Sequence, residues 1–201
     1  MLGERAPRDP VVSFDNEPLI LVDENDIVIG HLTKSEAHRG IGMLHRAFSL
    51  FVFDLDGRLL LQRRASVKRL WPDFWSNTCC SHPRRGEDME KAIHRRLHEE
   101  LQLSCVLEFL FKFQYQAQFD DEGAENELCS VFAGYTNDRP QFNRSEISEL
   151  RYVEPAELDR EMQRTPDAFT PWFKMEWAQL RRNALPSLPR AGLRVGASSR
   201  R

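Results

Sequence analysis

The sequence predicts an α+β domain, in which a mixed β-sheet is flanked by helices. Paired strand patterns joined by short turns come first, and one amphipathic helix follows them before further strand patterns and two terminal helices. This order is neither a regular alternation of strands and helices nor a run of strands alone, so it favours the α+β class. A length of 201 residues suits a single domain with a sizeable core.

The composition excludes several classes of protein. A content of 41% hydrophobic and 29% charged residues is typical of a soluble globular chain. The net charge of −3 gives no broad electrostatic reason to bind nucleic acid. No apolar run reaches the roughly 18 residues that would span a bilayer, and the first residues have no apolar signal segment. We therefore expect neither a nucleic-acid nor a membrane partner, and a monomer or weak homodimer.

The cysteines indicate the cellular compartment. They show no C-x-x-C pair and no zinc-finger spacing, and the two adjacent ones are not expected to bridge each other. This usage favours a reducing cytoplasm. The four residues are Cys79, Cys80, Cys105 and Cys129.

The first half of the chain predicts two hairpins. Residues 19–22 and 27–32 form short strand patterns around an acidic turn, which gives an N-terminal hairpin. Residues 34–42 are polar and carry two glycines, so they predict a loop or a short helix. Residues 47–54 are apolar on both faces, as expected of a fully buried strand. Asp56-Gly57 then predicts a tight turn into a partner strand over 58–62.

The second half predicts further strands and then helices. Residues 106–118 alternate apolar and polar side chains, which indicates a half-exposed strand. After a turn at 119–124, residues 125–135 give the next strand, and 146–153 end in a short one. Residues 155–164 and 171–182 predict helices. We expect a flexible N-terminal tail over 1–17, the domain over 18–183, and a basic, disordered tail over 184–201.

The most informative stretch is residues 77–103. A Cys-Cys-Ser-His-Pro turn leads into a helix over about 87–101, and its apolar stripe consists of Met89, Ala92, Ile93 and Leu97. Arg96 and Glu100 lie inside this stripe. A charge that faces a core is costly unless it is paired or binds a metal. Two interpretations stay open: a buried Arg96–Glu100 pair at i,i+4 spacing, or a helix face that lines a site for a cation and an anion.

Histidines and glutamates elsewhere suggest a metal site. Glu125 and Glu127 share one face of a predicted strand, because side chains alternate along it. Taken alone, that pair is better explained as solvent-exposed. His38, His45 and His82 each lie beside a predicted turn or strand end. Any single histidine is better explained as an ordinary surface or core residue, but three imidazoles and two carboxylates together suit an octahedral Mn²⁺ or Mg²⁺ ion.

The central stretch also resembles the Nudix box, G-x5-E-x7-R-E-U-x-E-E-x-G-U, with U an aliphatic residue. The positions that match are Glu87, Arg95, Leu97, Glu99, Glu100 and Leu103. Ser81 and Gln102 replace the two glycines, and Arg96 replaces a glutamate. Together with H-x6-H, T-C-C-S-H-P and E-N-E in this order, the chain over about 19–180 resembles the type 1 isopentenyl-diphosphate delta-isomerases. This resemblance implies a Nudix-type mixed sheet with an N-terminal hairpin extension.

The same resemblance implies an activity and a set of site residues. The activity is the metal-dependent interconversion of isopentenyl and dimethylallyl diphosphate. The Mn²⁺ or Mg²⁺ ligands would be His38, His45, His82, Glu125 and Glu127. Glu100, with the main chain at Cys80, would hold a second, diphosphate-bound Mg²⁺. The catalytic residues would be Cys80, Glu127 and Tyr115. The diphosphate-binding cations would be Lys34, Arg64, Lys68 and Arg96, and Trp172 would cover the hydrocarbon.

Other functions and roles stay open at this point. The chain could be a Nudix hydrolase of nucleoside diphosphates, against which Arg96 counts, or a non-catalytic Nudix binding module. Cys80 could be an inert buried thiol. Arg63 and Arg69 could belong to a solvated basic patch. Trp71 and Trp75 are better explained as core residues than as site residues.

Overall fold

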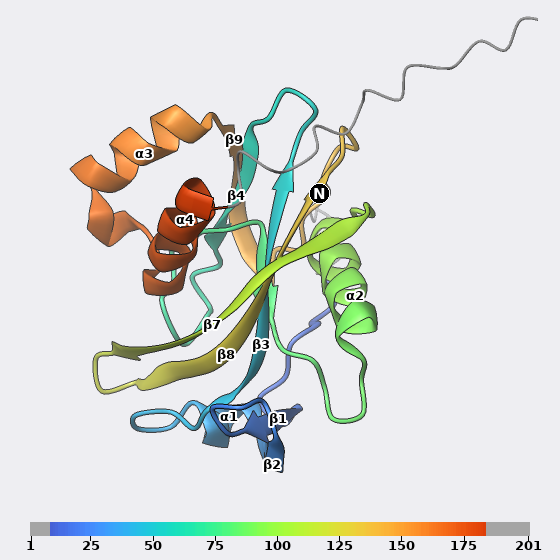
Figure 1. The fold of residues 1–201 in the computed structure, drawn as a ribbon, viewed down its shortest axis with the longest axis vertical. Helices are drawn as coiled ribbons and strands as arrows, with labels where there is room; N and C mark the ends of the chain where they lie inside the picture. The colour runs from blue at the N-terminus through green and yellow to red at the C-terminus, as the bar shows by residue number, and fades with distance from the viewer. Residues whose placement is uncertain (1–8, 184–201) are drawn as a thin grey trace, which may run out of the picture.

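The computed structural model describes residues 9–183, which form one nine-stranded sheet with helices on both of its faces (Figure 1). The predicted C-terminal tail and residues 1–8 of the predicted N-terminal tail lie outside the described residues. The strands are β1 Pro18–Val22, β2 Val28–Thr33, β3 His45–Phe53, β4 Leu59–Arg64, β5 Trp75–Ser76, β6 Cys79–Ser81, β7 Leu107–Phe119, β8 Gly123–Tyr135 and β9 Ile147–Val153. The helices are α1 Lys34–Ala37, α2 Met89–Leu101, α3 Pro155–Arg164 and α4 Pro171–Asn183, with a 3₁₀ turn at Pro166–Ala168.

The sheet is organised around β3. Along one edge β3 pairs in parallel with β8, from His45 opposite Glu127 to Phe53 opposite Tyr135. Its other edge pairs in antiparallel fashion with β1, β6 and β4 in turn. Every β3 residue except Arg46 is buried, as the apolar sequence predicts. Because β3 is shared in this way, β6 and β8 are held on opposite sides of it.

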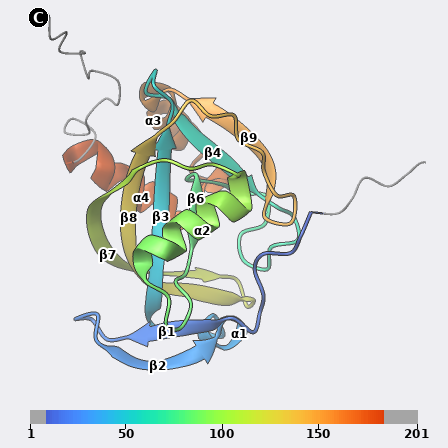
Figure 2. The same cartoon turned by 90° about the vertical axis from the view of Figure 1, so that its right-hand side faces the viewer.

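Helices cover the sheet on both faces (Figures 1 and 2). Alternate β3 residues belong to two separate cores, because successive side chains point to opposite faces. Phe48 and Leu50 pack in the core that contains the apolar stripe of α2. Phe51 and Phe53 pack in the larger core, which contains residues of α3 and α4. Cys80, Tyr115 and Trp172, which are described below, belong to the larger core or pack against it.

The helices and most of the strands were predicted correctly, and the fold class is confirmed. The Cys-Cys-Ser segment differs from the expectation, because it is the short strand β6 and not a turn. Its residues pair with Phe48, Ser49 and Leu50 of β3. The central helix begins at Met89, two residues later than expected, with Asp88 as its N-cap. None of the helices within residues 9–183 is both long and apolar enough to cross a bilayer.

The described part of the N-terminal segment is held against the domain. Arg96 Nη1 donates a 2.7 Å hydrogen bond to the carbonyl oxygen of Val12. Lys34 Nζ donates to Ser13 Oγ. Residues 9–17 were expected to belong to a flexible tail, and in the structure they make specific contacts with two of the predicted site residues.

Candidate active site

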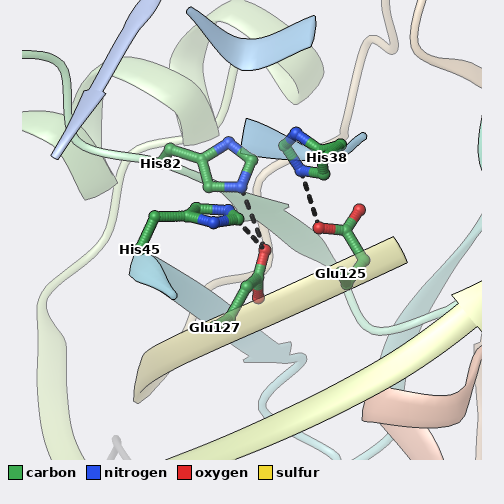
Figure 3. Close-up of side chains that lie close together, drawn as sticks. All are labelled: His38, His45, His82, Glu125 and Glu127. Carbon is green, nitrogen blue, oxygen red and sulfur yellow. Dashed lines mark hydrogen bonds and ion pairs between the residues drawn. The ribbon is translucent and has the colours of Figure 1, made fainter. Parts of the chain in front are cut away.

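Five buried side chains from four parts of the fold converge on one point (Figure 3). Each offers one ligand atom, and these atoms all lie within 4.8 Å of one another. His38 is the C-cap residue of α1, His45 begins β3, and His82 follows β6. Glu125 and Glu127 come from the same face of β8, as the alternation of side chains predicted. The structure thus brings together the five residues predicted to hold the Mn²⁺ or Mg²⁺ ion, whereas Glu100 and Cys80, which were predicted for a second Mg²⁺, are not part of this cluster.

Backbone carbonyls orient two of the histidines. His38 Nδ1 lies 2.6 Å from the carbonyl oxygen of Lys34, and His45 Nδ1 lies 2.7 Å from that of Met43. A carbonyl oxygen can only accept, so each Nδ1 carries the proton and each Nε2 presents a lone pair. Metal-binding histidines typically donate the N–H of their other ring nitrogen to a carbonyl oxygen in this way.

The Nε2 lone pairs of these two histidines accept no hydrogen bond from residues 9–183. The Nε2 atoms of His38 and His45 and the Oε2 atom of Glu125 are buried without a hydrogen-bond partner in the described part of the chain. His38 Nε2 nevertheless lies 2.7 Å from Glu125 Oε2. Two acceptors at this distance repel each other unless a proton or a metal ion lies between them. The cluster therefore fits a divalent cation.

The protonation of the cluster is consistent with this. Burial, and then the neighbouring His38, lowers the pKa of His45 to about 4. Burial also holds the pKa of His82 well below its ordinary value. Both imidazoles are therefore neutral and able to donate a lone pair. Burial opposes ionisation of Glu125, but His38 outweighs it and lowers the pKa of that carboxyl.

Glu127 is the most strongly constrained carboxylate in the cluster. Its Oε1 lies 2.9 Å from His82 Nε2 and 3.8 Å from His45 Nε2. The hydroxyl of Tyr115 donates a 2.7 Å hydrogen bond to its Oε2. Tyr115 reaches it because the two residues are direct partners in the β7–β8 ladder. In the metal-free protein, burial and the adjacent Glu125 raise the pKa of Glu127 well above its ordinary range.

A cavity of about 340 Å³ opens beside the cluster, and both Cys80 and Glu127 line it. Cys80 faces the larger core and the cavity, whereas Cys79 packs in the core of α2. Burial raises the pKa of the Cys80 thiol to about 12, against the opposing effect of Arg64. All four cysteines lie within the described residues and are free thiols.

Aromatic rings form one wall of the cavity. Trp172 lines it and is only 2% exposed. The Trp71 ring packs edge-on at 5.1 Å and the Tyr115 ring lies 6.2 Å away, measured between ring centroids. The guanidinium of Arg64 lies 5.3 Å from the Trp172 ring centroid. Trp71 is a buried core residue, as expected, and it also supports Trp172.

Cationic side chains also line the cavity. The four predicted diphosphate-binding residues are among them, namely Lys34, Arg64, Lys68 and Arg96. Arg69 also lines it, whereas Arg63 instead donates to the carbonyl oxygen of Asp73 outside the cavity. Burial, and then the charge of Lys68, lowers the pKa of Lys34 to about 8.

A buried acid that sequence reasoning missed holds two of these cations. Glu146 lines the cavity, accepts a hydrogen bond from Lys68 and lies 3.3 Å from Arg96 Nη2. One glutamate before a short strand gives no sequence signal of burial. Ser81 also lines the cavity, although the sequence singled it out only as a replacement for the box glycine.

The Arg96–Glu100 pair is present in the structure. Arg96 Nε donates to Glu100 Oε1 at 3.1 Å, and both side chains are 2% exposed. Arg96 also lines the cavity. The interpretation as a buried pair is confirmed, and the interpretation as a site for a cation and an anion stays a prediction. Glu100 and His45 are not among the cavity-lining residues. They lie behind it, Glu100 on α2 and His45 in the metal-ligand cluster.

Comparisons with known proteins agree with this architecture. The NUDIX domain family model matches residues 43–173. A protein of Photorhabdus laumondii named isopentenyl-diphosphate delta-isomerase 1 is 40% identical, over 86% of this chain and 99% of its own. An isopentenyl-diphosphate delta-isomerase of Pectobacterium atrosepticum is 44% identical, over 81% of this chain and 90% of its own.

Solved structures share the fold at lower identity. A Deinococcus radiodurans protein superposes with a TM-score of 0.61 at 24% identity, over 73% of this chain and 89% of its own. The MutT protein of Methanosarcina mazei gives a TM-score of 0.57 at 16% identity, over 69% of this chain and 94% of its own. These two likenesses concern the fold alone.

Proposed function

Because the chain belongs to the isopentenyl-diphosphate delta-isomerases of the NUDIX family, we propose that its cavity interconverts isopentenyl diphosphate and dimethylallyl diphosphate, with Cys80 and Glu127 as the acid–base pair. One observation carries the choice of these two residues. They come from β6 and β8, on opposite sides of β3, and line the same cavity next to the histidine–glutamate cluster.

The chemistry requires two positioned groups. One adds a proton to the terminal methylene carbon of the alkene, and the other removes a proton from the carbon on the far side of the branch point. The double bond moves by one position, and the reverse reaction exchanges the two roles. An alkene is a very weak base, so the path goes through a tertiary carbocation or a species close to it. A thiol and a carboxyl can fill the acid and base roles.

The aromatic wall suits a cationic intermediate. The face of a desolvated aromatic ring stabilises a cation by roughly 2 kcal/mol, and Trp172 is in position to provide it. Tyr115 fixes the Glu127 carboxyl through its hydrogen bond and can assist the proton transfer. Water would capture the cation, and the nearly complete burial of Trp172 and Tyr115 keeps this wall dry.

The proposed cofactors are divalent cations. Three histidines and two glutamates would hold Mn²⁺ or Mg²⁺, which would fix the Glu127 carboxyl and bias which of its oxygens carries a proton. We assign a second, diphosphate-bound Mg²⁺ to Glu100 and the main chain at Cys80. The charge of Glu100 is close enough to Cys79, the residue before Cys80, to add to the effect of burial in raising the pKa of that thiol, which supports this placement.

The cationic part of the cavity would hold the diphosphate. Lys34, Arg64, Lys68 and Arg96 offer donors to it, and such charge-assisted bonds fix a substrate and lend binding energy to its orientation. Glu146 keeps Lys68 and Arg96 together. The free cysteines support a cytoplasmic location as part of the proposal.

The test is turnover of isopentenyl diphosphate by the purified protein with Mg²⁺. We expect an acid-labile allylic diphosphate to form without release of inorganic phosphate. Phosphate release in its place would support a hydrolase, and binding without any product would support a binding module. Cys80→Ser should remove most turnover, whereas the matched control Cys105→Ser, at a half-buried cysteine outside the cavity, should not.

A further inference from the structure

Glu176 is a buried carboxyl that the proposed mechanism does not use. It lies on α4, four residues after Trp172, and is 0% exposed. Only burial and hydrogen bonds of Ser49 and Cys129 act on its pKa, with no cation among its partners in residues 9–183. An unpaired buried carboxylate is strongly disfavoured, so such a group keeps its proton. Burial raises its pKa to about 8.

The partners of Glu176 are neighbours of the acid–base pair. Its Oε1 lies 3.5 Å from Cys129 Sγ, which lies 3.6 Å from Ser49 Oγ. Ser49 is the direct partner of Cys80 in the β3–β6 ladder. Cys129 follows Glu127 by two residues on β8, so both point to the same face of the sheet. Cys129 therefore lies between Glu176 and Glu127, and Ser49 lies between Glu176 and Cys80.

The groups that face Glu176 cannot neutralise its charge. The titratable groups near Glu176 are thiols and a carboxyl, namely Cys129 and Glu127 on β8 and Cys80 on β6. The charge of Glu176 raises the pKa of each of them. Ser49 on β3 is uncharged. Arg64 on β4 instead donates to the carbonyl oxygens of Leu70 and Trp71.

We propose that Glu176 is a positioning residue that works as a neutral carboxylic acid, holding Ser49 and Cys129 beside the acid–base pair, and that its ionisation stops turnover at alkaline pH. The inference rests on the proposed isomerase function. Its Oε2 is buried without a partner. A charge there would draw water into the core or displace the two partners, and the adjacent cavity has to stay dry.

The test compares pH profiles of kcat and KM between Glu176→Gln and the wild type. A group with a pKa of about 8 is roughly one-tenth protonated at about pH 9, so the wild-type kcat should fall about tenfold between about pH 7 and about pH 9. Gln is permanently neutral, so this alkaline fall should be absent from the variant. The matched control is Glu157→Gln, at an exposed carboxyl of α3, and it should keep the wild-type profile.

A second variant keeps the inference testable if Glu176→Gln does not fold. The hydrogen bond of Ser49 lowers the pKa of Glu176, so Ser49→Ala should move the alkaline fall to higher pH. It should reduce kcat and leave KM unchanged, because Ser49 does not line the cavity. An alkaline fall at the wild-type position in both variants would overturn the inference. A wild type without turnover at any pH would instead refute the proposed function.

Infrared spectroscopy tests the protonation state without relying on turnover. The difference spectrum between the wild type and Glu176→Gln at neutral pH should show the band of a buried protonated carboxylic acid, and this difference should disappear as the pH is raised through about 8. Glu157→Gln should show no such difference from the wild type. A band that is unchanged by Glu176→Gln would contradict a neutral Glu176.

Discussion

Cys80 and Glu127 reach one cavity from strands that flank β3 on opposite sides. Cys80 is fixed by its pairing with Ser49, and Glu127 by its pairing with His45. A substrate between them would meet a thiol on one side and a carboxyl on the other. One proton can then be added and another removed without either group changing place.

Tyr115→Phe tests the role of the hydrogen bond to Glu127. The change removes the donor to Oε2 and leaves that oxygen without this partner. A hydrogen bond to a charged group contributes about 1.5–3 kcal/mol, so we expect kcat to fall roughly tenfold to a hundredfold. KM should change little. Steady-state kinetics measures both, and Tyr152→Phe, at a residue outside the cavity, is the control. An unchanged kcat would exclude a role for this bond.

Metal analysis of His45→Ala tests the cluster. The imidazole of His45 is fully buried and its Nε2 has no other partner, so its loss should remove a ligand outright. We expect the bound Mn²⁺ or Mg²⁺ to be lost or to become at least tenfold weaker, as measured by elemental analysis and titration calorimetry. His98→Ala, at an exposed residue of α2, should bind metal like the wild type. Equal metal content in the two variants would contradict the assignment.

Lys68→Met tests diphosphate binding. The residue lines the cavity and offers a cation to the substrate, so its loss should raise KM for isopentenyl diphosphate about tenfold or more. The expected change in kcat is smaller, because Lys68 is placed at the diphosphate and not at the alkene. Lys91→Met, at an exposed lysine paired with Asp88, should keep the wild-type KM. A KM that Lys68→Met leaves unchanged would remove Lys68 from the site.

The free energy of unfolding should depend on pH because of Glu176. Its folded-state pKa of about 8 lies above the ordinary value of 4.5, so the folded protein binds this proton more tightly than the unfolded chain does. The resulting stabilisation is full below about pH 4.5 and is lost as the pH rises through about 8.

Urea denaturation of the wild type and Glu176→Gln measures this loss. The free energy of unfolding of the wild type, relative to the variant, should fall by a few kcal/mol, on the order of that pKa shift, between about pH 5 and about pH 9. Glu157→Gln should show no such difference from the wild type. A difference between wild type and Glu176→Gln that is constant with pH would show that Glu176 ionises as readily in the folded protein as in the unfolded chain.

The sequence predicts those elements whose buried side chains recur with a regular period along the chain. The apolar run of β3 and the stripe of α2 are long enough for their period to be read, and Arg96 and Glu100 stand out because they interrupt the stripe. The metal-ligand set was predictable for a different reason. Its residue types and their spacing were distinctive together, although no single histidine was.

Other features depend on tertiary packing that no local pattern shows. Three residues are too few for β6 to show a period, and its pairing with β3 follows from the fold. Glu176 follows Met175 on an ordinary amphipathic helix, where a carboxyl is usually exposed. The one signal was Ser49, a lone polar side chain within AFSLFVF, which marks a polar contact inside the core. That contact is the cluster of Ser49, Cys129 and Glu176.

The central claim is that Cys80 and Glu127 act together, and a double-mutant cycle on kcat tests it most directly. We expect Cys80→Ser and Glu127→Gln each to reduce kcat by about a hundredfold or more, and the double variant to fall little below the worse single variant, because loss of either group disables the unit. Metal content is measured alongside, since Glu127 also belongs to the cluster. Losses that multiply in the double variant would show that the two residues act independently, which contradicts the account.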